Sequence, residues 1–113
     1  MRHHYELTPR AQKDLRKIDP RVRKRLVEGL DRLAEIPPAA NLDIDTISGH
    51  EPFRRLRIGD WRIIYRPLTR SEMNVLVLRR GTCEGMTGFL IERFVDRQHL
   101  ERAVATLELV ELD

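Results

Sequence analysis

The stretch FRRLRIGDWRIIYR, residues 53–66, decides the fold of this chain. Residues 53–58 and 61–67 are rich in aliphatic, aromatic and arginine side chains whose apolar positions suit paired strands. Gly59 and Asp60 stand between the two runs, and this pair suits the tight turn of a β-hairpin. The stretch therefore predicts two antiparallel strands that carry five arginines between them.

Side-chain alternation assigns these arginines to the faces of the sheet. Arg55 and Arg57 share one face of the first strand, and Arg62 and Arg66 share one face of the second. If helices cover one side of the sheet, the other side is left as a shallow open surface carrying arginines. A guanidinium is permanently charged, and its planar fork fits a phosphate group. The alternative is a solvated face with cross-strand pairs between arginines and acids. Because few acids lie nearby in the sequence, we favour an anion-binding platform.

Residues before the hairpin predict one strand and two helices. HHYELT, residues 3–8, alternates like a short strand. Thr8-Pro9 and Asp19-Pro20 each combine a capping residue with a proline, which favours a helix start. Apolar side chains at helical spacing predict a hairpin of two helices, residues 9–17 and 20–36. Residues 37–52 have breaking signals and no period, so we expect a loop.

Residues after the hairpin predict a central strand and a terminal helix. MNVLVLR, residues 73–79, is a nearly continuous apolar run, which favours a strand buried on both faces. FLIERFV, residues 89–95, fits either another strand or the start of a helix. Asp96 is a good cap, and the apolar spacing after it predicts a helix over 97–108. The predicted fold class is α+β: an N-terminal strand, a helical hairpin, antiparallel strands forming one sheet, and an extra C-terminal helix.

Length and composition favour one globular domain over residues 1–113. Hydrophobic residues make up 41% and charged residues 35%, which excludes a disordered chain. No run of about 18 apolar residues suggests a membrane span, and the N-terminus lacks the apolar stretch of a secretory signal. The single cysteine, Cys83, excludes an internal disulfide and fits a reducing compartment. We therefore expect a cytoplasmic protein without a membrane partner.

The positive charge is concentrated in the middle of the chain. Residues 53–80 contain eight arginines and two acids, whereas residues 81–113 contain three arginines and seven acids. This asymmetry favours an anionic partner, with nucleic acid first among the candidates. The alternative is a general replacement of lysine by arginine, because the chain has only three lysines.

Histidine and cysteine give no signal for a metal or cofactor. His3, His4, His50 and His99 lack ligand spacing, and one cysteine does not make a zinc site. His50 precedes the arginine-rich strands and could carry a proton near neutral pH, although a surface-loop position is the favoured interpretation. We expect neither a metal nor a cofactor.

The predicted order of elements resembles the RelE/ParE toxin superfamily of bacterial toxin–antitoxin systems. The motifs that carry the resemblance are AQKDLRKI, FRRLRIGDWRIIYR and VLVLRRG, and it runs from about Tyr5 to Arg80. Residues 81–113 form an extension outside it. In this superfamily, RelE-like members cut messenger RNA on the ribosome and ParE-like members inhibit DNA gyrase.

Carried over residue by residue, the resemblance implies that Arg55, Arg57 and Arg62 are the catalytic and phosphate-binding groups. Arg62, in DWRIIY, is the firmest match. The family pattern continues with a basic residue and a tyrosine, where this chain has Cys83 and, as its nearest aromatic, Phe89. The flanking Arg79 and Arg80 are then the candidates to bind substrate. The general base is not identified, and ribosomal RNA or His50 could supply it.

The resemblance implies a RelE-like, metal-independent endoribonuclease that inhibits translation and acts without a cofactor. Its partners would be messenger RNA, the ribosome and a cognate antitoxin whose acidic segment covers the arginine face. Two alternatives stay open: a ParE-like gyrase inhibitor without catalytic activity, and a catalytically decayed subunit that binds antitoxin.

The predicted C-terminal helix has three interpretations. Its narrow apolar stripe is expected to be buried against another surface, and we favour packing on the domain's own sheet. A second copy of the chain could take that place and make a homodimer. Alternatively, the acidic helix could lie across the arginine face and weaken nucleic-acid binding.

Overall fold

The fold is an α+β arrangement around one mixed sheet, as predicted. The computed structural model describes residues 2–80 and 87–109, with the backbone alone for residues 77–80. Five strands lie in the order β1-β5-β4-β3-β2, with β1 parallel to β5 and the other neighbours antiparallel. The elements are β1 (His4–Leu7), α1 (Pro9–Arg16), α2 (Pro20–Ala34), β2 (Asp43–Thr46), β3 (Arg54–Ile58), β4 (Trp61–Pro67), α3 (Arg70–Arg80), β5 (Gly88–Asp96), a 3-10 turn (Arg97–His99) and α4 (Leu100–Ala105).

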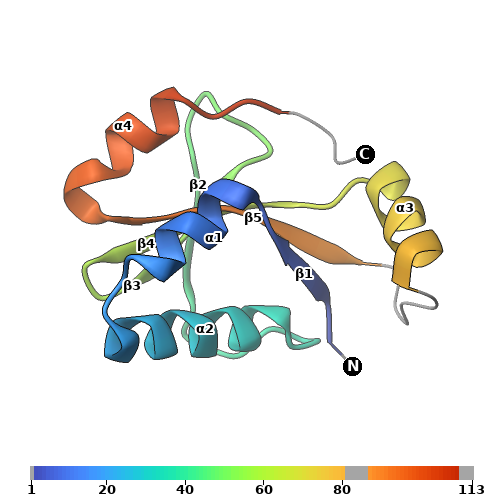
Figure 1. The fold of residues 1–113 in the computed structure, drawn as a ribbon, viewed down its shortest axis with the longest axis horizontal. Coiled ribbons are helices and arrows are strands. Elements are labelled where there is room, and N and C mark those ends of the chain that lie inside the picture. Colours follow the sequence, from blue (N-terminus) through green and yellow to red (C-terminus); the bar gives the residue numbers. More distant parts are fainter. Residues whose placement is uncertain (1, 81–86, 110–113) are drawn as a thin grey trace.

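The helices lie on both sides of the sheet. Figure 1 shows α2 and α4 on opposite sides of the sheet, α1 in front of the strands between them, and α3 at one end of the molecule. Buried side chains of α1 and α2 belong to the same core. The sheet is therefore only partly covered on the side of α4, because that helix has six residues.

The two N-terminal helices begin where their capping residues predict. The Thr8 hydroxyl accepts a hydrogen bond from the backbone N–H of Ala11, and the Asp19 carboxylate accepts one from Arg21. A proline opens each helix, where its missing N–H costs nothing. The predicted helical hairpin is confirmed.

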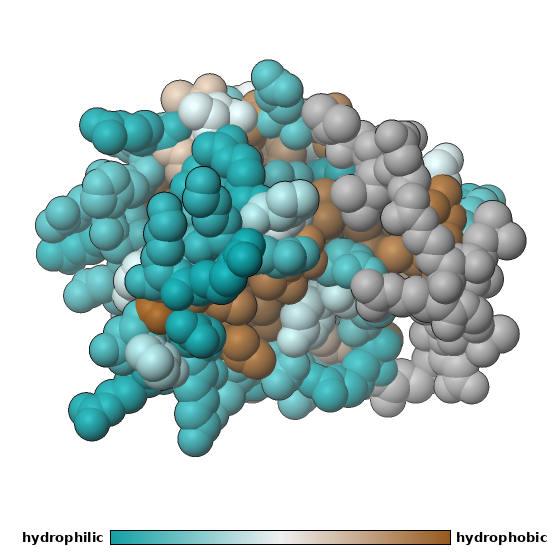
Figure 2. Space-filling model, in the orientation of Figure 1, coloured by the Kyte–Doolittle hydropathy of each residue, from teal (hydrophilic) through white to brown (hydrophobic). Residues whose placement is uncertain are grey.

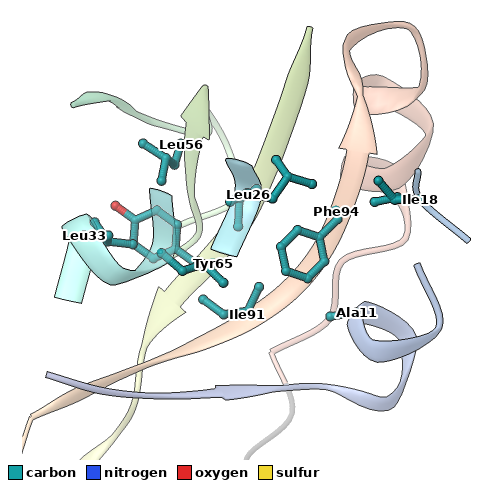
Figure 3. Close-up of a cluster of buried hydrophobic side chains, with 10 residues drawn as sticks. Ala11, Ile18, Leu26, Leu33, Leu56, Tyr65, Ile91 and Phe94 are labelled. Carbon is teal, nitrogen blue, oxygen red and sulfur yellow. The ribbon is translucent and has the colours of Figure 1, made fainter. Parts of the chain in front are cut away.

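The main hydrophobic core fills the space between this hairpin and the sheet. Leu26 and Leu33 of α2 point toward Leu56 and Tyr65 of the sheet, as Figure 3 shows. Gly29 faces Ile58, whose side chain occupies the place that a Cβ at position 29 would need, so α2 approaches β3 closely. The remaining buried members of this core are Ala11, Ile18, Leu30, Ile63, Ile91 and Phe94.

The predicted strand over residues 73–79 is wrong, because this segment belongs to α3. The Glu72 carboxylate accepts the N–H of Thr69 at 2.9 Å, and the Thr69 hydroxyl accepts the N–H of Glu72 at 3.1 Å. This reciprocal capping box starts a helix, and Met73 and Leu76 are then buried one turn apart. An apolar run without a clear period does not distinguish a buried strand from a buried helix.

The central position belongs instead to β5. Of the two possibilities left open for residues 89–95, the strand is correct, and it pairs with β4 on one side and β1 on the other. The terminal helix is also confirmed, although α4 ends at Ala105, three residues before the predicted end.

The predicted loop over residues 37–52 contains an unpredicted strand, β2. All four of its residues are exposed, so no buried face marks it in the sequence. It exists because its backbone pairs with β3, with Asp43 opposite Arg57 and Asp45 opposite Arg55.

The surface on the side of α1 is mostly hydrophilic. Figure 2 shows hydrophobic side chains between hydrophilic ones near the middle of this view. Within the described residues, no helix has the length and apolar character needed to cross a membrane.

Candidate nucleic-acid interface

Three of the predicted site residues meet on one face of the β3–β4 hairpin. Arg57 lies directly opposite Arg62, and Arg55 lies opposite Ile64. Alternation places these side chains on the face away from α2, since their neighbours Leu56 and Ile63 belong to the main core. We call Arg55, Arg57 and Arg62 the arginine face. Two arginines directly opposite each other repel, so this arrangement is favourable only beside negative charge.

The acids that the sequence seemed to lack are supplied by β2. The Arg55 guanidinium contacts the Asp43 carboxylate at 3.3 Å and the Asp45 carboxylate at 3.6 Å. Arg57 lies 3.9 Å from Asp43. The expectation that too few acids lie nearby was therefore wrong, because it rested on reading residues 43–46 as loop.

Arg62 differs from its two neighbours. Among the described residues, no carboxylate forms an ion pair with it. Its guanidinium donates instead to the backbone carbonyls of Gly59 and Trp61, each at 3.0 Å. Partial burial lowers the pKa of Arg62, and the charges of Arg57 and Arg55 lower it further. The charge of Asp43 acts in the opposite direction, but Arg62 remains a cation without a paired carboxylate among the described residues.

Arg66 was predicted to share this face, and it is instead a buried structural group. Its terminal nitrogens lie 2.7 and 2.9 Å from the two carboxylate oxygens of Glu72. Both side chains are fully buried. Alternation predicts correctly the side of the sheet on which Arg66 lies. However, Glu72 at the start of α3 binds and buries the Arg66 guanidinium, so a ligand cannot reach it.

The predicted substrate-binding residues Arg79 and Arg80 stand at the C-terminal end of α3 rather than on a central strand. Their side chains, and all of Cys83, lie outside the described residues. Phe89 is described, and its ring packs edge-on against Tyr65 on the side of the main core. Phe89 is thus on the wrong face of the sheet to stand beside Arg62.

The C-terminal helix packs on the same side of the sheet as the arginine face. Its apolar residues complete a second small core with Phe53, Ile64 and Val95. The packing members contributed by the C-terminal segment are Leu100, Ala103, Val104 and Leu107. The favoured interpretation, a helix that completes the domain, is confirmed. No ion pair joins the described part of this helix to the arginine face. The interpretation in which the acidic helix lies across the arginine face is therefore not supported by any contact among the described residues.

A cleft of about 420 Å³ separates α1 from α4. The residues that line it include the aromatic Trp61 and Phe94 and the basic Arg10, Lys17 and Arg102. The carboxylate of Asp14 in this cleft is already engaged by Arg93, at 2.7 Å, and by the N–H of Phe94. This cleft could not be predicted from the sequence, because three stretches far apart in the chain, residues 10–18, 61 and 93–106, line it.

His50 lies in the loop between β2 and β3, where its backbone accepts from Phe53. No group of three or more potential metal ligands occurs within the described ranges.

Comparison with protein families identifies the class. The model of the ParE toxin of type II toxin–antitoxin system, parDE, matches residues 5–81. This is more than half of the chain, so the protein belongs to that family within the RelE/ParE superfamily and is a toxin of a type II toxin–antitoxin system. A comparison with curated proteins gives no match.

Solved structures with a similar fold include three toxin–antitoxin complexes. The RelB–RelE antitoxin–toxin complex from Methanococcus jannaschii matches with 18% identity and a TM-score of 0.57, over 85% of this chain and 94% of that chain. The RelBE2 complex from Mycobacterium tuberculosis has 21% identity and a TM-score of 0.57, over 86% and 100%. The archaeal RelE–RelB complex from Pyrococcus horikoshii OT3 has 20% identity and a TM-score of 0.58, over 86% and 97%. At such identities, the likeness concerns the fold.

Proposed function

We propose that this toxin is a ribosome-dependent endoribonuclease that cuts messenger RNA, with Arg62 as the residue that stabilises the transition state. The observation that supports it is the charge of Arg62, which forms no ion pair among the described residues and is held on β4 beside Arg55 and Arg57 of β3. Arg55 and Arg57 would hold the neighbouring phosphates.

The chemistry requires charge stabilisation above all. In this reaction the ribose 2′-hydroxyl gives up its proton and attacks the adjacent phosphate, the P–O5′ bond breaks, and the 5′-oxygen leaves with a proton supplied by a general acid. Negative charge builds up on the non-bridging oxygens of the pentacoordinate phosphate in between. A fixed guanidinium aimed at that charge lowers the barrier, and loss of one such donor typically costs about 100-fold to 1,000-fold in rate. An arginine is a poor base because its pKa lies above about 12, so the proton must go to another group. We propose ribosomal RNA or His50 for that role.

The test is cleavage of a defined messenger RNA by purified protein on programmed ribosomes. We expect cuts at fixed codon positions, and a loss of about 100-fold or more for Arg62→Ala. Arg62→Lys should be intermediate, since it keeps the charge and loses the planar fork. Arg21→Ala is the matched control, because Arg21 is an exposed arginine at the start of α2. Equal activity of Arg62→Ala and Arg21→Ala would overturn the assignment.

A second candidate is inhibition of DNA gyrase by binding alone. The observations that favour it are the ParE description of the matching family and the ion pairs that already occupy Arg55 and Arg57. In a supercoiling assay, it predicts inhibition at stoichiometric protein while added RNA stays intact. A decayed subunit that only binds antitoxin would be inactive in both assays.

We also propose that a cognate antitoxin is a partner of this protein. The proposal is supported by the similar folds of three proteins whose structures were solved in toxin–antitoxin complexes. Co-expression with the product of an adjacent short gene, followed by co-purification, tests this pairing. Recovery of the toxin alone in the presence of that product would contradict it.

A further inference from the structure

β2 is an exposed edge strand that carries two acids toward the arginine face. Within the part of the chain that the structure describes, it pairs only with β3, and all four of its residues are exposed. Because side chains alternate, Asp43 and Asp45 point to the same side as the arginines across from them, Arg57 and Arg55.

The contacts use the same nitrogens that a phosphate would use. One terminal nitrogen of Arg55 faces Asp43 at 3.3 Å, and the other faces Asp45 at 3.6 Å. Both ends of the guanidinium fork are thus directed to carboxylates. Arg57 shares Asp43 at 3.9 Å, and its Nε donates to the carbonyl of Gly59 at 3.4 Å.

These ion pairs are too exposed to be explained by stability. The side chains of Asp43 and Asp45 are 50% and 64% exposed. Exposed pairs of this kind contribute little to folding. The two carboxylates do, however, reduce the positive charge that an incoming anion meets. Because they are exposed to solvent, they can become hydrated when a phosphate takes their place at the arginines.

We propose that Asp43 and Asp45 are an internal competitor for phosphate, which lowers the affinity of the arginine face for RNA and leaves Arg62 as the first contact. A bound RNA then exchanges each carboxylate for a phosphate at Arg55 and Arg57. The proposal rests on the proposed function in one respect, namely that the anion is an RNA backbone.

The consequence is selectivity for an RNA held in place over a free strand. A free strand must displace two carboxylates and also lose its own conformational freedom. An RNA held in a fixed path presents its phosphates already ordered, so it displaces the carboxylates at a smaller cost. The two acids would thus act as specificity-determining residues.

The experiment measures binding of a fluorescein-labelled oligouridylate 10-mer by anisotropy at two salt concentrations. The variant is Asp43→Asn/Asp45→Asn, which keeps the size of both side chains and one accepting oxygen in each, and removes their charge. We expect binding about 10-fold tighter at low salt, with a steeper slope against the logarithm of salt concentration, by about 0.7 for each phosphate newly contacted.

The matched control is Asp31→Asn/Glu35→Gln, which changes the net charge equally on and just after α2, the helix on the opposite side of the sheet. Adding Arg55→Ala to the β2 variant should remove most of the gain. Equal tightening by the control, or unchanged binding by the β2 variant, would overturn the proposal. Each Asn substitution is also made singly, so that a folded variant is at hand if the double substitution melts early.

The outcome of this experiment can be distinguished from the outcome of the Arg62 test. If the β2 variant binds as the wild type does while Arg62→Ala abolishes cleavage, the competitor idea fails and the ribonuclease stands. If no variant binds RNA and the wild type does not cut messenger RNA, both the competitor proposal and the ribonuclease proposal are wrong.

Discussion

Removal of the Glu72 carboxylate should destabilise the protein strongly, because this buried group makes two interactions: an ion pair with Arg66 and a hydrogen bond from the N–H of Thr69. Its oxygens bind both terminal nitrogens of Arg66, and both side chains are fully buried. One of the same oxygens caps α3 through the N–H of Thr69. In Glu72→Leu, a buried guanidinium loses its closest counter-charge, and the capping box of α3 loses one of its two hydrogen bonds, while the bond from the N–H of residue 72 to the Thr69 hydroxyl remains.

The magnitude follows from these two losses. Breaking a buried pair by removing one partner costs about 3–5 kcal/mol, and loss of one hydrogen bond of the capping box costs about 1 kcal/mol. Glu92 lies 3.8 Å from Nε of Arg66 and can take over part of the pairing, which favours the lower half of the range. We therefore expect a loss of about 4–5 kcal/mol and a fall in Tm of about 15–20 °C, at roughly 4 °C per kcal/mol for a domain of this size.

Urea denaturation followed by circular dichroism provides the measurement, in a double-mutant cycle with Arg66→Met. The double variant removes both charges, and a hydrophobic pair in their place is often nearly neutral. We expect it to be less destabilised than the sum of the single variants by about 3 kcal/mol. Glu72→Gln is the control for the cap, since glutamine still accepts from the helix start. A loss below about 1 kcal/mol for Glu72→Leu, or simple additivity in the cycle, would refute the reasoning.

Three further predictions concern stability. Gly88→Ala should cost about 1–3 kcal/mol in chemical denaturation, because the new Cβ would stand 2.7 Å from the carbonyl oxygen of His4 and must push β1 from β5. Thr8→Ala should cost about 1–2 kcal/mol, since its hydroxyl caps α1 and also donates to the carbonyl of Glu92 at 3.0 Å, whereas Thr8→Ser should retain most of the stability. Burial raises the pKa of Glu92 above its ordinary 4.5, so the folded state binds the proton more tightly than the unfolded state. The free energy of unfolding contributed by this group therefore falls as the pH rises from 4.5 through the raised pKa, and Glu92→Gln should remove that slope in urea titrations over pH 4–8.

Two parts of the fold could be read from the sequence because their causes are local. Thr8-Pro9 and Asp19-Pro20 fix the starts of α1 and α2 through contacts within one turn. Gly59-Asp60 fixes the hairpin, and the hairpin fixes which arginines share a face. The start of α3 is also local, because Thr69 followed three residues later by Glu72 forms a capping box, although the apolar run after it is equally typical of a buried strand.

Other features depended on neighbours far away in the chain. β2 has no buried residue, so only its pairing with β3 makes it a strand. That pairing then decides the electrostatics of the site, because Asp43 reaches Arg55 from twelve residues away. The cleft between α1 and α4 is likewise made by segments that the sequence keeps apart.

The superfamily could be recognised from the sequence through the resemblance of its motifs. The α+β class and the face on which Arg55, Arg57 and Arg62 stand could be predicted because capping, turn formation and side-chain alternation act over a few residues. Which of these arginines lacks a carboxylate partner depends on the tertiary structure. Arg66 is enclosed by the cap of α3, Arg55 and Arg57 meet the acids of an edge strand, and Arg62 meets backbone carbonyls alone among the described residues. The charge available at a guanidinium depends on what packs within about 4 Å of it, and that is set by elements brought together in space.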